Sequence, residues 1–209
     1  MRPKPIVLAS LLAVVLVITC CTEMTESTPA KSKPYSNMTP DPDEFPINAV
    51  ALNLPLVDPS IVVSKSRRRL MLYSSDKLVR VYRIGLGTDS VNDKLIEGDR
   101  RTPEGEFYIF TKNDQSSFFL SLGLSYPNIE DAERGLSEAL ITQEQHDQIV
   151  DAINRKAMPP QKTALGGEVY IHGNGSQSDW TWGCVALDDK DIRELFDAVA
   201  VNTKVIIEH

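Results

Sequence analysis

Apolar residues beyond position 60 fall into short runs, and polar, turn-rich segments separate these runs. The runs are rich in Val, Ile, Leu and Tyr, a composition that predicts β-strands rather than helices. One run alternates, with Val79, Val81 and Ile84 among polar and aromatic neighbours, and Ser74-Ser75-Asp76 before it predicts a hairpin turn. The expected strands cover residues 61–63, 70–73, 78–86, 106–111, 118–122, 168–172, 184–187 and 203–207.

Two other stretches have the period of amphipathic helices. Thr142 to Gln145 has the pattern of a capping box, apolar residues then recur at helical spacing, and Pro159-Pro160 ends the stretch. The second stretch begins at Asp188, a residue type suited to cap a helix. The apolar positions are Ile149, Val150, Ile153 and Ala157 in the first stretch and Ile192, Leu195, Phe196 and Val199 in the second. The folded part is therefore expected to be mainly β (α+β), with a few helices.

Residues 1–20 have the pattern of a signal peptide. Arg2 and Lys4 precede an apolar stretch at residues 6–18, which is shorter than the roughly 20 residues of a membrane span but fits a signal sequence. Cys20-Cys21 follows, and this order resembles a bacterial lipoprotein signal with Cys21 as the lipidated residue. Lipidation of Cys20 and an ordinary cleaved signal peptide are the alternatives.

Residues 21–59 are expected to form a Pro/Ser/Thr-rich tether. Seven of the thirteen prolines lie between Pro29 and Pro59, mixed with Ser, Thr, Asn and Asp. Such a segment cannot bury enough apolar surface to offset the entropy of ordering. The folded domain is therefore expected over residues 60–209.

Charge and ligand counts exclude several kinds of function. The formal net charge of −7 argues against nucleic-acid binding, because phosphate recognition needs a basic face. The basic run Arg67-Arg68-Arg69 is interpreted as a solvated strand or turn edge, and Asp179 as a turn residue. One Cys and one His without further such residues nearby cannot supply a zinc site of three or four ligands, so neither a metal nor a cofactor is expected.

Elimination among the histidines and cysteines leaves one nucleophilic pair. His209 is terminal, and His146 lies on the apolar stripe of an expected helix, which indicates a structural role. His172 ends a strand-like run and precedes Gly173, which lets the backbone turn sharply. Cys184 follows twelve positions later, and in an exported protein a cysteine without a partner is a candidate reactive thiol. A base and a thiol presented in this way can act together in nucleophilic catalysis.

These residues belong to a longer ordered pattern. From about residue 60 to residue 208 the chain resembles the L,D-transpeptidase catalytic domain (YkuD type). The resemblance implies a β-sandwich-like domain with a helical insertion before the catalytic histidine. It also implies that Cys184 is the nucleophile, His172 the general base and Gly183 the neighbouring glycine. The pattern consists of Gly85-x-Gly87, Lys94, Glu97-Gly98-Asp99, Thr102-Pro103-Glu104-Gly105-x-Phe107, Ile171-His172-Gly173 and Gly183-Cys184.

The segment around the cysteine departs from the commonest family form, Ser/Thr-His-Gly-Cys-x-Arg. Thr181 keeps the first position, but Trp182 replaces the histidine and Ala186 replaces the arginine. The segment is similar to a variant branch of the family with the pattern D-W-T-x-G-C-x-A. An arginine that could hold a carboxylate or orient the loop is missing. Gly183, Trp182, Thr181 and Gly173 are the expected oxyanion or site-lining residues.

The resemblance implies a cysteine-dependent peptidoglycan L,D-transpeptidase, which forms a thioester with a stem peptide and transfers it to an amine. One alternative is a carboxypeptidase or amidase that uses the same pair, and another is a non-catalytic wall-binding lipoprotein. The expected partners are stem peptides and, through the lipid, a membrane. We expect an exported, periplasmic protein. The outer membrane is favoured because Thr22, after Cys21, is not the aspartate that retains lipoproteins in the inner membrane.

Overall fold

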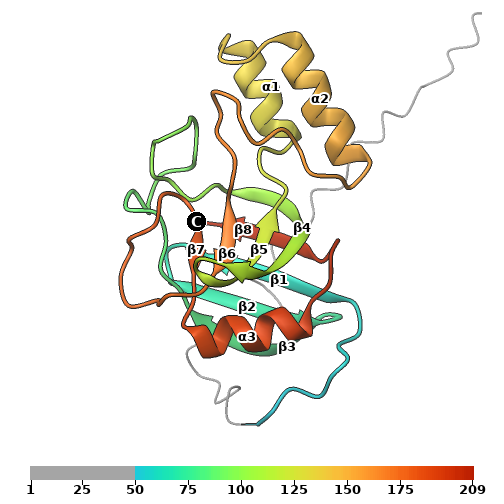
Figure 1. Cartoon of the computed structure of the whole chain (residues 1–209), viewed down its shortest axis with the longest axis vertical. Coiled ribbons are helices and arrows are strands. Elements are labelled where there is room, and N and C mark those ends of the chain that lie inside the picture. Colours follow the sequence, from blue (N-terminus) through green and yellow to red (C-terminus); the bar gives the residue numbers. More distant parts are fainter. Residues whose placement is uncertain (1–49) are drawn as a thin grey trace, which may run out of the picture. The chain divides into compact units, whose positions relative to one another are not determined.

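The computed structural model describes residues 50–209, which form a mainly β domain with three helices (Figure 1). The expected signal peptide, Cys21 and most of the expected tether lie outside the described residues. Within residues 50–209, no helix is both long and apolar enough to cross a membrane. The mainly β (α+β) fold predicted from the sequence is confirmed.

Eight strands form the sheet, in the spatial order β3-β2-β1-β8-β4-β5-β6-β7. The pairs β1–β8 and β6–β7 are parallel, and all other neighbours are antiparallel. The strands are β1 Pro59–Ser64, β2 Arg69–Ser74, β3 Lys77–Arg83, β4 Gly105–Ser116, β5 Phe119–Leu124, β6 Tyr170–His172, β7 Val185–Ala186 and β8 Lys204–Glu208. The helices are α1 Ile129–Ser137, α2 Gln143–Asn154 and α3 Asp189–Ala198.

The sheet curls at β4, because this strand pairs with β8 in one half of the sheet and with β5 in the other half. The first residues of β4 pair with β8, whereas its later residues pair with β5, so the strand turns from one half of the sheet to the other. Gly85, just after β3, exchanges two backbone hydrogen bonds of 2.9 and 2.8 Å with Ala186 in β7, at the opposite edge. The apolar core lies between the two halves, as expected for a β-sandwich-like domain.

Each expected strand is present, but β4 continues to Ser116, five residues beyond its expected end, and β3 differs in extent and in the side that it buries. It ends at Arg83 because the next residues leave to bridge Ala186 and Thr181. Arg80 and Tyr82 are more buried than Val79 and Val81, so the expected alternation was wrong in phase. Tyr82 packs in the core, and Arg80 forms an ion pair with a glutamate of α3.

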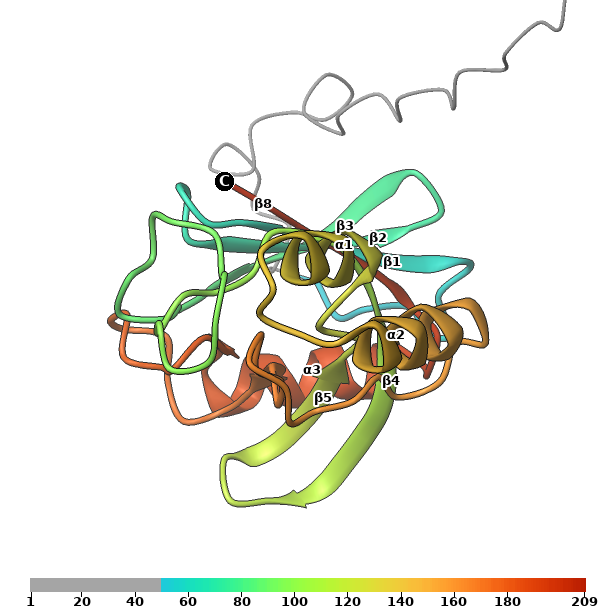
Figure 2. The ribbon, with the colours of Figure 1, turned by 90° about the horizontal axis from the view of Figure 1, so that it is seen from above.

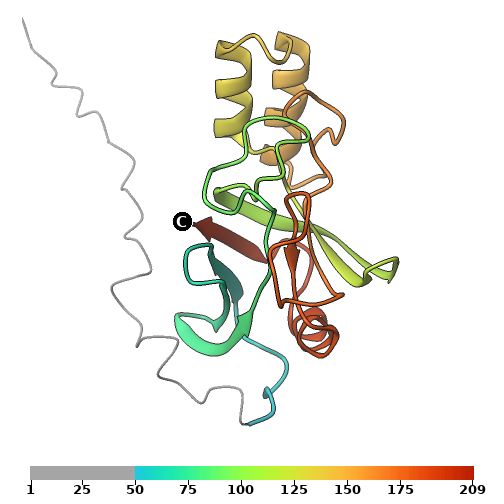
Figure 3. The ribbon, with the colours of Figure 1, turned by 90° about the vertical axis from the view of Figure 1, so that its left-hand side faces the viewer.

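The predicted helical insertion before His172 is confirmed and contains two helices. α1 and α2 lie side by side between β5 and β6 in the chain, at one end of the sheet (Figures 1 and 3). The capping box predicted at Thr142 and Gln145 is present, with hydrogen bonds of 3.2 and 3.0 Å. α1 was not predicted, although Asn128 and Asp131 form a second capping box that starts it. A small separate core of Ala132, Ile141, Ile149 and Leu165 joins the pair.

Candidate active site

The register of β6 and β7 brings the candidate base and thiol to one side of the sheet. Ile171 pairs with Val185, and both side chains lie in the core. Because side chains alternate along a strand, His172 and Cys184 project to the opposite side. Both residues line one cavity of about 320 Å³, so a single ligand there can contact the thiol and the imidazole.

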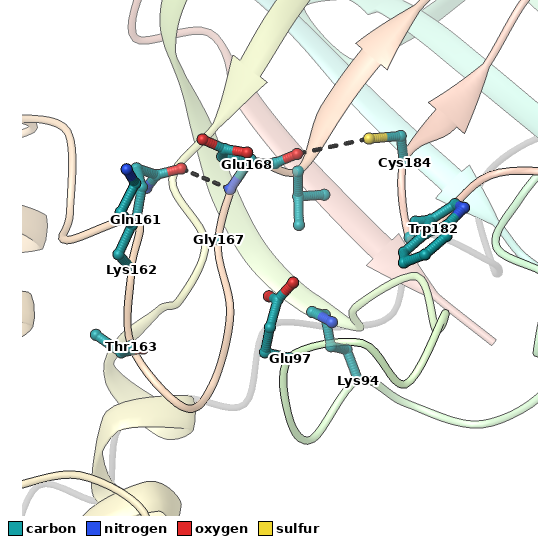
Figure 4. A pocket seen from close by; sticks show the side chains of 11 residues that line it. Lys94, Glu97, Gln161, Lys162, Thr163, Gly167, Glu168, Trp182 and Cys184 are labelled. Atoms are coloured by element: carbon teal, nitrogen blue, oxygen red, sulfur yellow. Dashed lines mark hydrogen bonds between the residues drawn. The ribbon is translucent and has the colours of Figure 1, made fainter.

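The Cys184 thiol sits among backbone groups of the segment that enters β6. Tyr170 N–H donates a hydrogen bond to Cys184 Sγ at 3.4 Å. The thiol itself donates to the Glu168 carbonyl oxygen at 3.6 Å (Figure 4). Burial raises the pKa of the Cys184 thiol to about 11, above the ordinary value of 9.0, because an enclosed thiolate loses hydration. The resting thiol is therefore protonated at neutral pH.

The His172 imidazole is buried and has one fixed hydrogen bond. Its Nδ1 lies 2.8 Å from the Gly173 carbonyl oxygen, which can only accept, so Nδ1 carries the proton and Nε2 is the basic nitrogen. Burial lowers the pKa of His172, since the imidazolium loses hydration. The ring also packs against Phe118 and Trp180, with ring centroids 4.6 and 5.6 Å away.

Cys184 also faces a larger cavity of about 490 Å³, on the side of the helical insertion. Figure 4 shows Trp182 beside the thiol and the side chains of Lys94 and Glu97 next to each other across the cavity. Glu168 lines both cavities, because it lies next to the thiol at the entrance to β6. The larger cavity is lined by Lys94, Glu97, Gln161, Lys162, Thr163, Gly167, Glu168, Val169, Trp182, Gly183 and Cys184.

The turn before Cys184 has a defined backbone conformation. The buried Thr181 hydroxyl donates to the Cys184 carbonyl oxygen at 2.7 Å and accepts from Gly183 N–H at 3.2 Å. Gly183 has a φ of +132°, and a Cβ there would lie 2.7 Å from the Arg101 carbonyl oxygen. Only glycine fits this combination of φ and contact. Trp182 is 69% exposed, and the Arg100 guanidinium lies 4.8 Å from its ring centroid.

An ion pair anchors the loop between β6 and β7. Arg68 donates to both carboxylate oxygens of Asp179 at 2.8 to 3.1 Å, and it donates to Ser90 Oγ at 2.6 Å. Asp179 also accepts from Leu86 N–H at 3.0 Å. The basic run lies at a turn edge as expected, but Arg68 is paired with Asp179 rather than only solvated, and Asp179 is more than a turn residue. A bidentate pair between residues 111 positions apart ties this loop to the β1–β2 turn.

Buried lysines hold the long polar segment that faces the site. Lys65 Nζ donates to the carbonyl oxygens of Asn92 and Thr102 and to Glu104 Oε1, at 2.8 to 3.0 Å. Lys94 Nζ donates to Asp99 Oδ1 at 2.8 Å. These contacts explain why a polar segment contains charged residues that are nonetheless buried.

The sequence comparison with known families decides the relationship. The model of the L,D-transpeptidase catalytic domain, YkuD, matches residues 58–207. The chain belongs to this family. No curated protein matches the chain.

Solved structures with a similar fold include three bacterial proteins. The helical cell shape determining protein Pgp2 from Campylobacter jejuni is 23% identical, with a TM-score of 0.49 over 72% of this chain and 47% of that one. An L,D-transpeptidase from Xylanimonas cellulosilytica is 14% identical, with a TM-score of 0.43 over 75% and 63%. An L,D-transpeptidase from Mycobacterium smegmatis is 11% identical, with a TM-score of 0.44 over 73% and 59%. The chain thus spans less than two thirds of the length of each.

The position of the arginine in the commonest L,D-transpeptidase motif is internal in this chain. Ala186 is fully buried in β7 and lines neither cavity. Its backbone instead closes the sheet through Gly85. The contact that orients the loop comes from elsewhere in the sequence, namely from Arg68 and Asp179.

The expected site residue Gly173 and the two histidines excluded from the site, His146 and His209, line neither cavity. Gly173 turns beside the β4–β5 hairpin, where a Cβ would lie 2.8 Å from the Phe118 carbonyl oxygen. His146 hydrogen-bonds Asp147 on α2, and His209 lies 3.7 Å from Glu104. Within the described part of the chain, no group of three or more His, Cys, Asp or Glu side chains could hold a metal.

Sequence reasoning missed several cavity residues of this L,D-transpeptidase family member. Glu168 and Tyr170 line the smaller cavity, and their position just before His172 was the available signal. Phe118 and Trp180 pack on the imidazole. Phe118 was not identifiable from local sequence, because it lies 54 residues before His172 and reaches it through strand pairing.

Proposed function

We propose that the protein is a cysteine-dependent peptidoglycan L,D-transpeptidase, with Cys184 as nucleophile and His172 as general base. The observation that carries the proposal is the shared cavity at Cys184 and His172, with the proton on Nδ1 of the base. The family supplies the substrate class, the peptidoglycan stem peptide. The charged larger cavity on the other side of the thiol offers room for a second peptide.

The first half-reaction transfers an acyl group to the cysteine. His172 Nε2 accepts the thiol proton as Sγ attacks the carbonyl carbon of the third stem-peptide residue. The neutral resting forms of both groups favour this coupled transfer over a preformed thiolate–imidazolium pair. The tetrahedral intermediate then collapses, the bond to the terminal D-alanine breaks, and the imidazolium gives its proton to the leaving amine.

The intermediate needs donors for its negative oxygen. Gly183 N–H already donates to Thr181 Oγ1, so we assign the Cys184 N–H as the main oxyanion donor, beside the Trp182 N–H. Thr181 supports this arrangement because its hydroxyl is bonded to both Gly183 and Cys184. Gly183 and Trp182 line the larger cavity beside the thiol. Gly173 allows the turn after His172 to pass close to the Phe118 carbonyl oxygen.

The second half-reaction releases the acyl group. His172 removes a proton from an incoming amine, the amine attacks the thioester carbonyl, and Sγ leaves with a proton from the imidazolium. Attack by water instead gives hydrolysis, and the exposed charged side chains of Glu97, Lys162 and Glu168 favour this as a second candidate activity, since they admit water to the larger cavity.

Product analysis separates the two activities. Purified tetrapeptide fragments are incubated with the protein and followed by mass spectrometry. Transfer gives dimers that lack one D-alanine, whereas hydrolysis gives shortened monomers alone. Cys184→Ala and His172→Ala should abolish all products, and His146→Ala, a histidine on α2, is the matched control that should remain active. Unchanged products with Cys184→Ala would rule out Cys184 as the nucleophile, whereas no products from the native protein would leave a non-catalytic wall-binding role.

We also propose that the protein is exported and anchored in a membrane by a lipid on Cys21. The apolar stretch at residues 6–18 and the cysteines after it support this proposal. Cys21→Ser should release the protein from the membrane fraction, whereas Cys20→Ser should not. If the Cys21→Ser variant stayed in the membrane fraction, this anchor would be ruled out. Separation of inner from outer membranes tests whether the protein lies in the outer membrane, the preferred location.

A further inference from the structure

The β4–β5 hairpin delivers an aromatic ring to the candidate base. β4 continues to Ser116 and β5 begins at Phe119, so the hairpin projects from the body of the domain (Figures 2 and 3). Phe118 lies at its tip and packs on the His172 ring, with centroids 4.6 Å apart and an interplanar angle of 31°. Tilted rings at this separation make a favourable aromatic contact.

Trp180 approaches the same imidazole from a different segment. Its ring meets His172 nearly edge-on, with centroids 5.6 Å apart and an angle of 68°. Phe118 and Trp180 are themselves 6.0 Å apart, and Trp180 Nε1 donates to the Gly175 carbonyl oxygen at 3.0 Å. Two rings from two elements therefore surround the imidazole.

The backbone holds the hairpin tip in place. Gly173 N–H, next to the base, donates to the Phe118 carbonyl oxygen at 3.0 Å. Ser121 and His172 are paired in the β5–β6 register. Phe118 is consequently positioned by main-chain contacts at its own carbonyl and three residues later, although the residue is 40% exposed.

We propose that Phe118 is a positioning residue that, together with Trp180, clamps the His172 imidazole and keeps water away from it. The proposal rests on the proposed role of His172 as the base. The clamp holds the ring in one orientation while Nδ1–H is bonded to the Gly173 carbonyl oxygen, so Nε2 is the nitrogen left to accept a proton in the cavity shared with the thiol. A base held in one orientation loses less entropy in reaching the transition state.

The clamp has a consequence for protonation. Covering the ring removes water that would solvate the imidazolium, so the clamp contributes to the lowered pKa of His172. The titratable groups near the ring are Cys184, Glu168 and Tyr170, which line the same cavity, and Asp189 of α3, which accepts from Asn174 N–H. The hairpin contributes Phe118 and uncharged polar side chains to this cavity, so substitution of Phe118 changes no charge there.

Phe119 provides a matched control. It has the same exposed fraction as Phe118, 40%, but its ring lies 5.2 Å from the Arg193 guanidinium rather than on His172. Phe118→Ala should lower kcat by about tenfold to a hundredfold at neutral pH. It should also raise the pKa of His172 and move the acid limb of the kcat/KM profile to higher pH, because the exposed imidazole holds its proton more strongly. Phe118→Tyr should restore both properties, and Phe119→Ala should change neither.

The histidine titration is measured directly by NMR on the labelled full chain, with the His172 signal assigned by its loss in His172→Gln. An unchanged His172 titration in Phe118→Ala would overturn the clamp, as would a rise in KM alone. If Phe118→Ala does not fold, Phe118→Leu, which keeps only part of the cover over the ring, should still show a smaller rise in the pKa of His172. Full activity of His172→Gln would instead contradict the proposed function, and the titration would still decide the clamp.

Discussion

At the residue scale, the chemistry depends on how two enclosed groups hold their protons. Cys184 keeps its proton because burial raises its pKa to about 11, and burial lowers the pKa of His172 so that the imidazole is neutral. A neutral thiol beside a neutral base reacts when the proton moves with the attack on the carbonyl. The thiol is thereby less exposed to unwanted oxidation or alkylation than a standing thiolate.

The reactivity of Cys184 toward iodoacetamide should therefore increase steeply with pH. With a pKa of about 11 in place of 9.0, the folded protein holds about a hundredfold less thiolate at pH 7 than a free cysteine. Alkylation of the Cys184 peptide is followed by mass spectrometry from pH 6 to 11, in the native and the urea-unfolded protein. The native rate should be the slower one and should continue to rise above pH 9. Fast native alkylation at pH 6 would indicate a standing ion pair with His172.

Gly183→Ala should destabilise the protein and abolish most activity. The added Cβ meets the Arg101 carbonyl oxygen and must adopt a φ of +132°, which together cost about 1–3 kcal/mol or more. Gly98→Ala is the matched control, because Gly98 has a φ of +79° but open space around its Cβ position. Urea unfolding should show a smaller loss for Gly98→Ala. Equal losses would mean that the collision with Arg101 contributes nothing.

At the scale of elements, the loop between β6 and β7 carries the nucleophile and is held at three places. Arg68 binds Asp179, and Trp180 Nε1 donates to the Gly175 carbonyl oxygen. Asp188 precedes α3 as expected, but its side chain makes no capping hydrogen bond. It accepts instead from Ser176 N–H and Ser176 Oγ, at 3.0 and 3.1 Å, and so ties the helix start to the loop.

Asp179→Asn should lower both stability and kcat. The amide keeps an acceptor for Leu86 N–H but loses the charge that pairs with Arg68, and a partly buried pair of this kind contributes about 1–3 kcal/mol. Asp151→Asn removes the exposed Asp151–Arg155 pair on α2 and should change the stability little, because solvent screens this pair. Thermal unfolding and product formation are measured for both variants. A kcat of Asp179→Asn equal to that of Asp151→Asn would show that the pair does not position the loop.

At the scale of the whole domain, one curled sheet brings distant segments to a single site. β4 joins the two halves of the sheet, and the hydrogen bonds between Gly85 and Ala186 connect the two edges of the sheet. Lys65 attaches the polar segment before β4 to the end of β1. α1 and α2 stand at one end, where their following segment forms a wall of the larger cavity. The cavities therefore depend on the closure of the sheet as much as on the local loops.

Lys65→Met should destabilise the domain by about 3–5 kcal/mol, because it leaves the Glu104 carboxylate and two carbonyl oxygens without their donor. Glu104 is partly exposed, so the lower end of this range is expected. The double variant Lys65→Met/Glu104→Gln should recover part of the loss in urea unfolding, since the unpaired charge is gone. Strict additivity of the two substitutions would show that the residues do not act as a pair.

The sequence by itself determined the strand segments, the helices α2 and α3, and the candidate pair of Cys184 and His172. Short apolar runs, a capping box and the elimination of other histidines and cysteines are local or countable properties, so they can be read along the chain. α1 escaped because it is only nine residues long and has few apolar side chains, although the Asn128 capping box was present. The phase of β3 was also wrong, since burial of Arg80 requires its partner on α3.

Only the tertiary structure decided how the site is assembled. The parallel register of β6 and β7 puts thiol and base on one side, the Arg68–Asp179 pair joins residues 111 positions apart, and Phe118 reaches His172 through a hairpin. Protonation states also belong to this level, because they depend on how much water each group loses when distant segments close around it. Local sequence specifies which groups are available, whereas long-range pairing and burial determine which of them meet and in what form.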